Sequence, residues 1–139
     1  MIIRKFEDTD EQDVDALLGS LKSGIKNKWI IGKGVPNELG KLSFALKYNV
    51  IEPGKLYPMH YCERTEATFV LEGKGVVRNE KEEFEIKTGD VVLVRCGEMH
   101  SIRNSGKTDL KTLSCIDLIT QANHHQEVIN NNKGEKDEY

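Results

Sequence analysis

The sequence contains little cysteine, and its few cysteines follow no pairing pattern. Its 139 residues include 3 cysteines, 3 prolines and 6% aromatic residues. Cys62, Cys96 and Cys115 are odd in number and irregularly spaced, which argues against a disulfide framework. Without a Cys-x-x-Cys pair, neither a structural zinc site nor a redox couple is expected. Reduced thiols are typical of the cytosol, so a cytoplasmic location is expected.

The sequence also lacks an excess of either charge sign and any long apolar run. The net charge is −3, and 31% of the residues are charged. Nucleic-acid-binding proteins usually present a basic face, so no nucleic-acid partner is expected. Even the longest apolar runs are short, such as Val91 to Val94, so no membrane partner or membrane-spanning segment is expected. The charged N-terminus lacks the apolar stretch of a signal peptide.

The composition divides the chain into three regions. Residues 1–27 are expected to form an N-terminal arm and helix, residues 28–120 a strand-rich domain, and residues 121–139 a polar tail with little apolar area to bury. A short helix is predicted over residues 7–23. The apolar residues there follow the i, i+3, i+4, i+7 spacing of one helical face, namely Val14, Leu17, Leu18 and Leu21.

From Trp29 onward, short apolar segments alternate with turn residues. Proline, asparagine and glycine separate these segments, for example at Pro53, Asn79 and Gly89. Short strands at such spacing predict an all-β sandwich or barrel, and not an alternating α/β fold. Cys115 lies in one of the segments and is expected to pack in the core as a small apolar residue.

Two segments contain the histidine, cysteine and glutamate side chains that could bind a metal ion. Four such residues occupy even positions between Gly54 and Gly73, namely His60, Cys62, Glu66 and Thr68. If that segment stays extended, their side chains point to one face of the strand. The segment from residue 89 to residue 104 supplies a second histidine, His100. Two imidazoles and a carboxylate suit a divalent ion such as iron, manganese, nickel or zinc, so the two segments predict a shared metal ion.

The spacing of these segments resembles the two motifs of the cupin family. The first, G(x)5HxH(x)3E(x)6G, matches the run from Gly54 to Gly73, and the second, G(x)5PxG(x)2H(x)3N, matches the run from Gly89 to Asn104. The fifteen residues between them resemble the short hairpin of compact bacterial cupins. The resemblance implies an all-β jelly-roll barrel, the double-stranded β-helix of cupins. It also implies that four residues stand at metal-ligand positions, namely His60, Cys62, Glu66 and His100.

Two positions depart from the family pattern. Cys62 replaces the usual second histidine, and Arg95 replaces the usual proline of the second motif. A thiolate ligand would favour zinc, copper or iron over manganese. Two alternatives are open for Cys62. It is either a ligand, or a residue of the pocket wall that leaves a three-ligand site of His60, Glu66 and His100.

Further candidate residues flank the ligand positions. Tyr57, Tyr61 and Glu66 are the candidate catalytic residues, since a tyrosine or carboxylate beside a metal can transfer a proton. Packing in the core or at the pocket rim is the alternative for the two tyrosines. Arg64 is either a group that binds a substrate carboxylate or a partner in an ion pair at the rim.

One subfamily resembles more of the chain. The ectoine synthases have a similar N-terminal arm and a central motif similar to His60-Tyr61-Cys62, although they have a lysine at the Cys62 position and a tyrosine at the Val92 position. The leading hypothesis is a metal-dependent enzyme acting on a small polar metabolite, as a lyase or cyclase, a dioxygenase or an isomerase. The alternatives are a non-catalytic small-molecule-binding or sensor protein, a metal-free structural cupin, and an ectoine synthase-like cyclase.

A homodimer is expected from the same resemblance, because similar cupins are commonly dimers. Ile2, Ile3 and Phe6 make the N-terminal arm apolar and suitable for pairing across a dimer interface. The alternative is that the arm closes the chain's own sheet.

Overall fold

The described part of the chain is built almost entirely of β-strands. The computed structural model describes residues 1–14, 23–32 and 42–119. A 3-10 helix, η1 (Phe6–Asp8), precedes ten strands, which are β1 (Glu11–Asp13), β2 (Ile25–Ile31), β3 (Phe44–Ile51), β4 (Leu56–Tyr61), β5 (Glu66–Glu72), β6 (Lys74–Arg78), β7 (Glu83–Lys87), β8 (Val91–Val94), β9 (Met99–Asn104) and β10 (Leu110–Asp117). Within these ranges no helix has the length and apolar character needed to cross a membrane.

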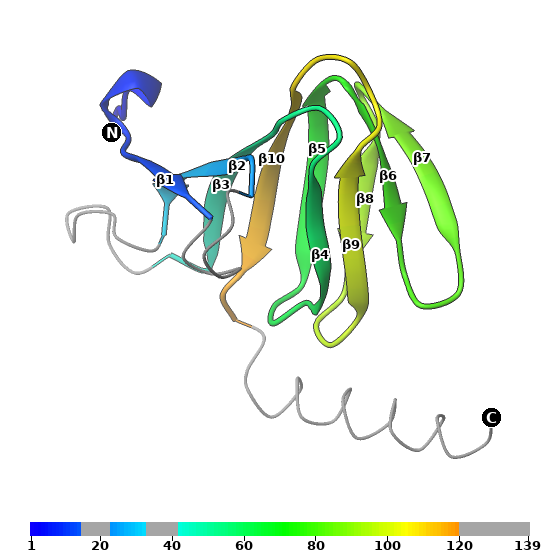
Figure 1. Ribbon diagram of the computed structural model, residues 1–139. Helices are drawn as coiled ribbons and strands as arrows, with labels where there is room; N and C mark the ends of the chain where they lie inside the picture. The colour runs from blue at the N-terminus through cyan, green and yellow to red at the C-terminus, as the bar shows by residue number, and fades with distance from the viewer. Residues whose placement is uncertain (15–22, 33–41, 120–139) are drawn as a thin grey trace.

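The strands form two antiparallel sheets (Figure 1). One sheet has the order β1-β2-β3-β10-β5-β8, and the other has the order β4-β9-β6-β7. The pairing is nested, because β3 pairs with β10, β4 with β9, β5 with β8 and β6 with β7. A long hairpin folded over in this way is a jelly roll. The predicted all-β jelly-roll fold is therefore confirmed.

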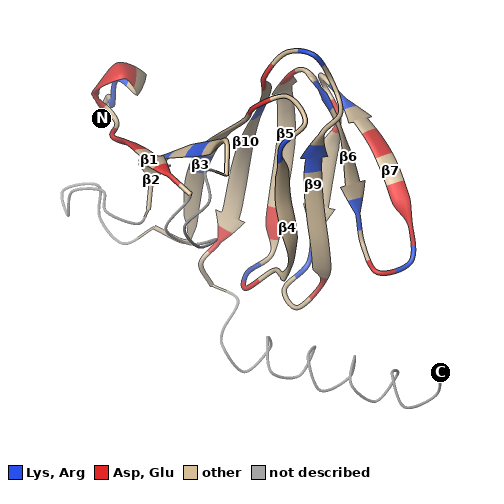
Figure 2. Ribbon diagram, viewed as in Figure 1, with Lys and Arg blue, Asp and Glu red and all other residues tan. Residues whose placement is uncertain are grey.

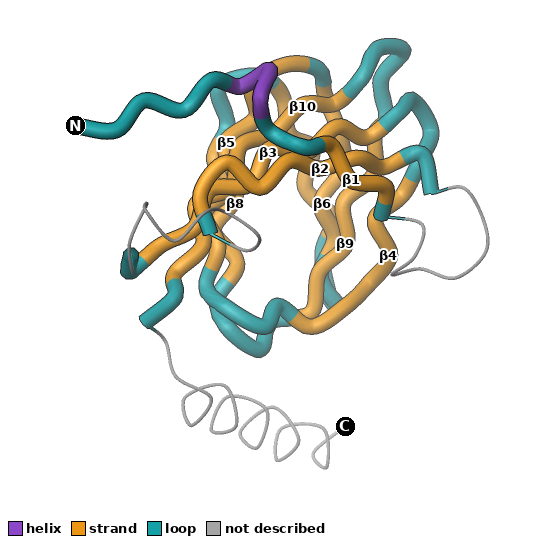
Figure 3. Tube along the Cα trace, turned by 90° about the vertical axis from the view of Figure 1, so that its left-hand side faces the viewer, coloured by secondary structure: helices purple, strands orange, loops and turns teal. Residues whose placement is uncertain are grey.

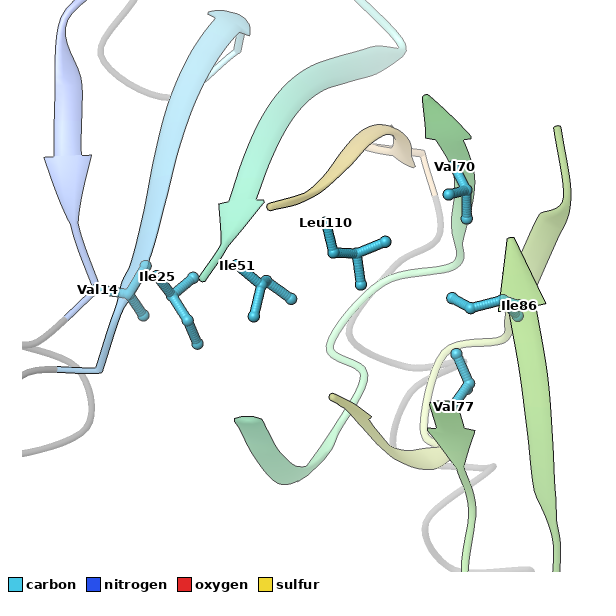
Figure 4. Packing of buried hydrophobic residues seen from close by; sticks show 7 residues of the cluster. All are labelled: Val14, Ile25, Ile51, Val70, Val77, Ile86 and Leu110. Atoms are coloured by element: carbon cyan, nitrogen blue, oxygen red, sulfur yellow. The ribbon is translucent and has the colours of Figure 1, made fainter. Parts of the chain in front are cut away.

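The two sheets face each other around a core of aliphatic side chains. In the view of Figure 3, β4 and β9 lie across the molecule from β5 and β8. The buried side chains that form the core are shown in Figure 4: Val14, Ile25, Ile51, Val70, Val77, Ile86 and Leu110. Each fully buried side chain of this size stabilises the fold by about 1.5–3 kcal/mol relative to an exposed one.

Asn104, the last residue of the second motif, joins several turns. Its side chain is completely buried. Its Nδ2 donates to the carbonyl oxygens of Ile51 at 2.7 Å and Thr108 at 2.8 Å, and its Oδ1 accepts from the N–H of Gly106 at 2.9 Å. Its own carbonyl accepts from the N–H of Gly54, the first residue of the first motif, at 3.1 Å. Asn104 therefore holds the ends of the two motifs together and has a structural role.

The glycines of both motifs serve turns between strands. Gly54, Gly73, Gly89 and Gly97 have φ values of 76°, 86°, 94° and 88°, in the left-handed region that favours glycine. At Gly73 there is also no space for a side chain, because a Cβ would lie 2.7 Å from the carbonyl oxygen of Asp109. The spacing of the motif glycines is thus a requirement of chain reversal.

The predicted N-terminal helix is wrong where the structure describes its beginning. Glu11–Asp13 form β1, which pairs with Lys26–Lys28 of β2. Pairing with a sheet edge satisfies the backbone there, and it outweighs a weak local helix preference. Val14, the first apolar residue of the helical pattern, lies in the core at 1% exposure. Residues 15–22, which include the rest of that pattern, lie outside the described residues.

Cys115 is exposed, which corrects the prediction that it is a core residue. Alternation along β10 turns Ser114 and Ile116 inward and therefore turns Cys115 outward. The predicted boundary between residues 27 and 28 falls inside β2, so part of the region assigned to the arm lies in the six-stranded sheet. The predicted tail lies outside the described residues.

We predict that Asn104→Ala lowers the free energy of unfolding by about 3 kcal/mol, because it removes the side-chain partners of two carbonyls and one N–H. Chemical denaturation followed by circular dichroism measures the loss. The matched control is Asn79→Ala, an exposed turn residue whose Oδ1 accepts from the N–H groups of Lys81 and Glu82, and about 1 kcal/mol is expected there. Equal losses in the two variants would contradict the role given to Asn104.

Candidate functional site

A small cavity of about 60 Å³ lies between the two sheets. Its apolar wall includes Ile51, Val77 and Ile102. The polar side chains that line it come from both sheets and are Lys47, Asn49, Tyr57, His60, Glu66, Thr68, His100, Thr112 and Ser114. Three of the four residues at the implied ligand positions therefore meet in one place.

His60 and His100 are direct neighbours across two strands. They are paired in the register of β4 and β9, and their ring centroids are 4.3 Å apart. His60 Nδ1 lies 2.7 Å from the carbonyl oxygen of Pro58. A carbonyl oxygen only accepts, so Nδ1 is the donor, and in the neutral ring Nε2 has the lone pair. His60 is thus held in the tautomer that can bind a metal or accept a proton through Nε2.

His100 is a half-buried, uncharged imidazole. Its Nδ1 is buried and makes no hydrogen bond of full geometry among the described residues, although the backbone of Glu98 is near enough to raise the pKa of the ring. Burial, followed by the neighbouring His60, outweighs that contact and lowers the pKa of His100 to about 4, so the ring is neutral at pH 7. A neutral ring with a weakly partnered nitrogen is suited to bind a cation or a hydrogen-bonding ligand.

Glu66 approaches the two histidines from the opposite sheet. It is the first residue of β5, and its Oε1 accepts a hydrogen bond from Thr68 Oγ1 at 3.2 Å. Thr68 Oγ1 in turn lies 2.9 Å from the hydroxyl of Ser114. The chain turns after β4, so the segment is not one extended strand, and His60 and Glu66 meet across the interior and not along one face.

Cys62 lies outside the cavity. Its side chain is 4% exposed, and its Sγ–H donates to the carbonyl oxygen of Arg64 at 2.7 Å. Burial, followed by the charge of Glu66, raises the pKa of the thiol to about 11. A protonated thiol directed at a carbonyl oxygen is a poor metal ligand, because the thiolate is the ligand form.

Two imidazoles and a carboxylate fit a divalent ion by their chemistry. Within residues 1–14, 23–32 and 42–119, no three histidine, cysteine, aspartate or glutamate side chains are already grouped closely enough to hold one. The site is therefore a pair of imidazoles near a carboxylate.

The two candidate tyrosines differ in position. Tyr57 lines the cavity, and its ring centroid lies 4.8 Å from that of His60. These residues are three apart, and the register shift between them in β4 allows both to face inward. Tyr61 is 42% exposed and does not line the cavity. Arg64 is also exposed, and its Nη1 donates to the carbonyl oxygen of Leu118 at 3.2 Å.

The structure explains the arginine that replaces proline in the second motif. The backbone N–H of Arg95 donates to Glu98 Oε2 at 2.7 Å, and the N–H of Glu98 donates to the carbonyl oxygen of Arg95 at 3.0 Å. Proline has no N–H and could not make the first bond. Glu98 therefore stabilises the turn before β9, at the position where the resembled motif has a proline.

A wider groove of about 660 Å³ adjoins the cavity. It runs along β6, β7 and β8 to the start of β9. The residues that line both the groove and the cavity are Val77, Val92, Val94 and His100. The groove therefore provides a path from solvent to His100. Acidic residues lie along β7 at its edge (Figure 2), and Glu85 lines it.

The cavity also contains polar residues that the sequence did not single out, of which Lys47 and Asn49 are the main ones. They alternate with Leu46 and Tyr48 along β3, in the same phase as the buried Ile51. Because they lie two and four residues before Ile51, their alternation with it could have identified them as inward-facing. Apolar residues occupy both faces of this strand, so alternation alone does not say which face is inward.

Comparison with known proteins agrees with this geometry. The cupin domain family matches residues 48–116. The chain is 31% identical over 120 residues to an oxalate-binding protein of Thermotoga maritima, and the aligned region covers 86% of this chain and 95% of that protein. It is 26% identical over 118 residues to an L-ectoine synthase of Saccharopolyspora erythraea, and the aligned region covers 84% of this chain and 78% of that protein. The structure is also similar to the crystal structure of a predicted oxalate decarboxylase from Thermotoga maritima, with a TM-score of 0.65 and 24% identity. The superposed region covers 85% of this chain and 100% of that chain. The chain belongs to the cupin family.

Proposed function

We propose that this cupin binds a small polar metabolite in its interior cavity, together with a divalent metal ion held by His60, Glu66 and His100. The observation on which the proposal rests is the pairing of His60 with His100 across β4 and β9, with Glu66 lining the same cavity. Polar groups that face an interior cavity are costly without partners, and a bound ligand removes that cost. Iron, zinc, manganese and nickel all suit this donor set.

A bound ion would supply Lewis-acid chemistry or activate water or dioxygen. Tyr57 is placed to hold or deliver a proton beside His60. Burial, followed by the charge of Glu66, raises the pKa of Tyr57, so its hydroxyl stays a donor at neutral pH. Thr68 orients Glu66 through the bond to Oε1. A lyase, cyclase, dioxygenase or isomerase reaction is compatible with this arrangement.

The names of two relatives support a small polar ligand. One is named for binding oxalate, and the other is named an ectoine synthase. An ectoine synthase-like cyclase is the less favoured alternative, because Val92 lines the cavity at the position where that resemblance implies a tyrosine. The aliphatic side chain brings no hydroxyl to the site.

A metal-free binding protein is the second candidate. Lys47 lines the same cavity and gives it a positive charge without any metal. The absence of a ready three-ligand group among the described residues also favours this candidate. It differs from the first proposal in one measurable property, which is the metal content of the purified protein.

We predict that protein purified without chelators contains about one divalent ion per chain and that His100→Ala loses it. Cys62→Ala should keep the ion, since the thiol points away from the cavity and donates to Arg64. Inductively coupled plasma mass spectrometry measures the content, with Cys115→Ala as the matched control for Cys62→Ala. A wild-type protein without metal would remove the first proposal, and loss of metal in Cys62→Ala would place the thiol among the ligands.

We predict that one thiol per chain reacts rapidly with Ellman's reagent in the native protein and that the other two react slowly. None of the three cysteines is in a disulfide in the described part of the chain, and Cys115 is exposed whereas Cys62 and Cys96 are buried. Buried thiols react only as the fold opens. Cys115→Ala should abolish the rapid phase and leave the slow one. A rapid phase that persists in this variant would contradict the burial of Cys62 and Cys96.

We also propose that the protein is a homodimer. Phe6 packs on the chain's own sheet, with its ring 4.9 Å from that of Tyr48. For this residue the contact favours the alternative, in which the arm closes the chain's own sheet. Ile2 and Ile3 remain exposed. The outer face of β5 and β8 is apolar as well, since Phe69 pairs with Val91, and both are exposed. A second copy is the partner we expect on this face.

We predict that light scattering on the eluting protein gives twice the mass of the chain and that Leu93→Asp gives the mass of one chain. Leu93 is 58% exposed on the outer face of β8, where a carboxylate would be buried by a second copy. Phe84→Asp on β7 is the matched control at 52% exposure and should leave the dimer intact. A monomeric wild-type protein would contradict the proposal.

A further inference from the structure

Lys47 places a basic side chain at the wall of the interior cavity. In the register of the six-stranded sheet it lies between Trp29 of β2 and Ser114 of β10. It lines the cavity with Asn49 and Ile51, which follow at alternate positions of β3 and so share its face. A lysine on the inner face of a sheet is costly unless its charge has a partner.

The protein provides no carboxylate partner for this lysine within the described ranges. The ion pairs found there are Lys26–Glu11, Arg78–Glu83 and Lys111–Glu72. The ammonium of Lys47 lies 5.3 Å from the ring centroid of Trp29. That contact positions the ammonium by attraction to the ring face, and it uses none of the three N–H donors in a hydrogen bond.

The groups around the lysine leave its charge available to a ligand. Glu66 lines the same cavity but makes no ion pair with Lys47, and its Oε1 accepts from Thr68. Under the proposed function Glu66 also binds the metal. An anion from solution is therefore the group that complements Lys47.

The size of the cavity limits which anions fit. A water needs about 10–15 Å³ of such space, so a cavity of about 60 Å³ has room for about four to six water-sized groups. Acetate, glycolate and oxalate have about four to six non-hydrogen atoms and match this room. A larger acid would place its remaining atoms in the adjoining groove, past Val92 and His100.

We infer that Lys47 binds the carboxylate of a small organic acid in the interior cavity and gives the site its preference for acids over neutral molecules. This inference rests on the proposed function, because it takes the same cavity as the ligand site. It names the ligand class, a small carboxylic acid, and adds a specificity-determining residue outside the cupin motifs.

The test compares acids with neutral amides of the same shape. Isothermal titration calorimetry measures the binding of acetate, glycolate and oxalate, and of acetamide, glycolamide and oxamide, to the full-length protein and to Lys47→Met. Loss of a charged hydrogen-bond partner is expected to weaken acid binding about 10- to 100-fold and to abolish the preference over the amides. A purely structural role for Lys47 would not change that preference.

Controls keep the outcome decisive. Lys26→Met removes an exposed lysine from the outer face of the neighbouring strand and should bind acids as the wild type does. Lys47→Gln, which keeps a polar side chain of similar length, replaces Lys47→Met if that variant does not fold. Metal content is measured in every sample, so that loss of the ion is distinguished from loss of the lysine.

Each result decides a different claim. Acid preference that persists in the folded Lys47 variant overturns this inference and leaves the proposed function standing. A wild-type protein that binds none of the three acids overturns both the inference and the small-acid ligand. If the wild type contains metal and Lys47→Met retains it, a change in acid binding is due to loss of the lysine and not to loss of the metal.

Discussion

The pairing of β4 with β9 is the constraint on which the site depends. It sets His60 directly opposite His100, and the nested strand order brings Glu66 to the same interior from the other sheet. A shift of one residue in this register would turn one imidazole outward, because side chains alternate along a strand. The register shift in β4 does the reverse for Tyr57, which it turns inward beside His60.

Most of the fold could be predicted from the sequence, because the motif residues are those that turns require. Glycines with positive φ and the buried Asn104 fix where strands end, and their spacing is visible without a structure. The strand at Glu11–Asp13 could not be predicted, since pairing with β2 decides it. Lys47 was missed because both faces of β3 contain apolar residues and only the partner strands show which face is inward.

The direction of the Cys62 side chain could not be predicted from strand alternation. Its position two residues after His60 predicts a shared face only while the chain stays extended, and β4 ends at Tyr61. The turn that follows directs the thiol to the carbonyl oxygen of Arg64 and begins β5 in the opposite sheet. At the position where the family pattern implies a ligand, the structure therefore has a buried thiol that donates to a backbone carbonyl. Lys47 instead brings a new charge into the cavity.

The central claim is that His60 and His100 together form a ligand site in the interior. The most direct measurement is a two-dimensional NMR spectrum of the imidazole nitrogens, recorded with and without added zinc. We predict that the ring nitrogen signals of His60 and His100 shift together at one equivalent of zinc, while those of the other two histidines of the sequence, His124 and His125, do not. Zinc-dependent shifts confined to His124 and His125, or no shift in any histidine, would contradict it.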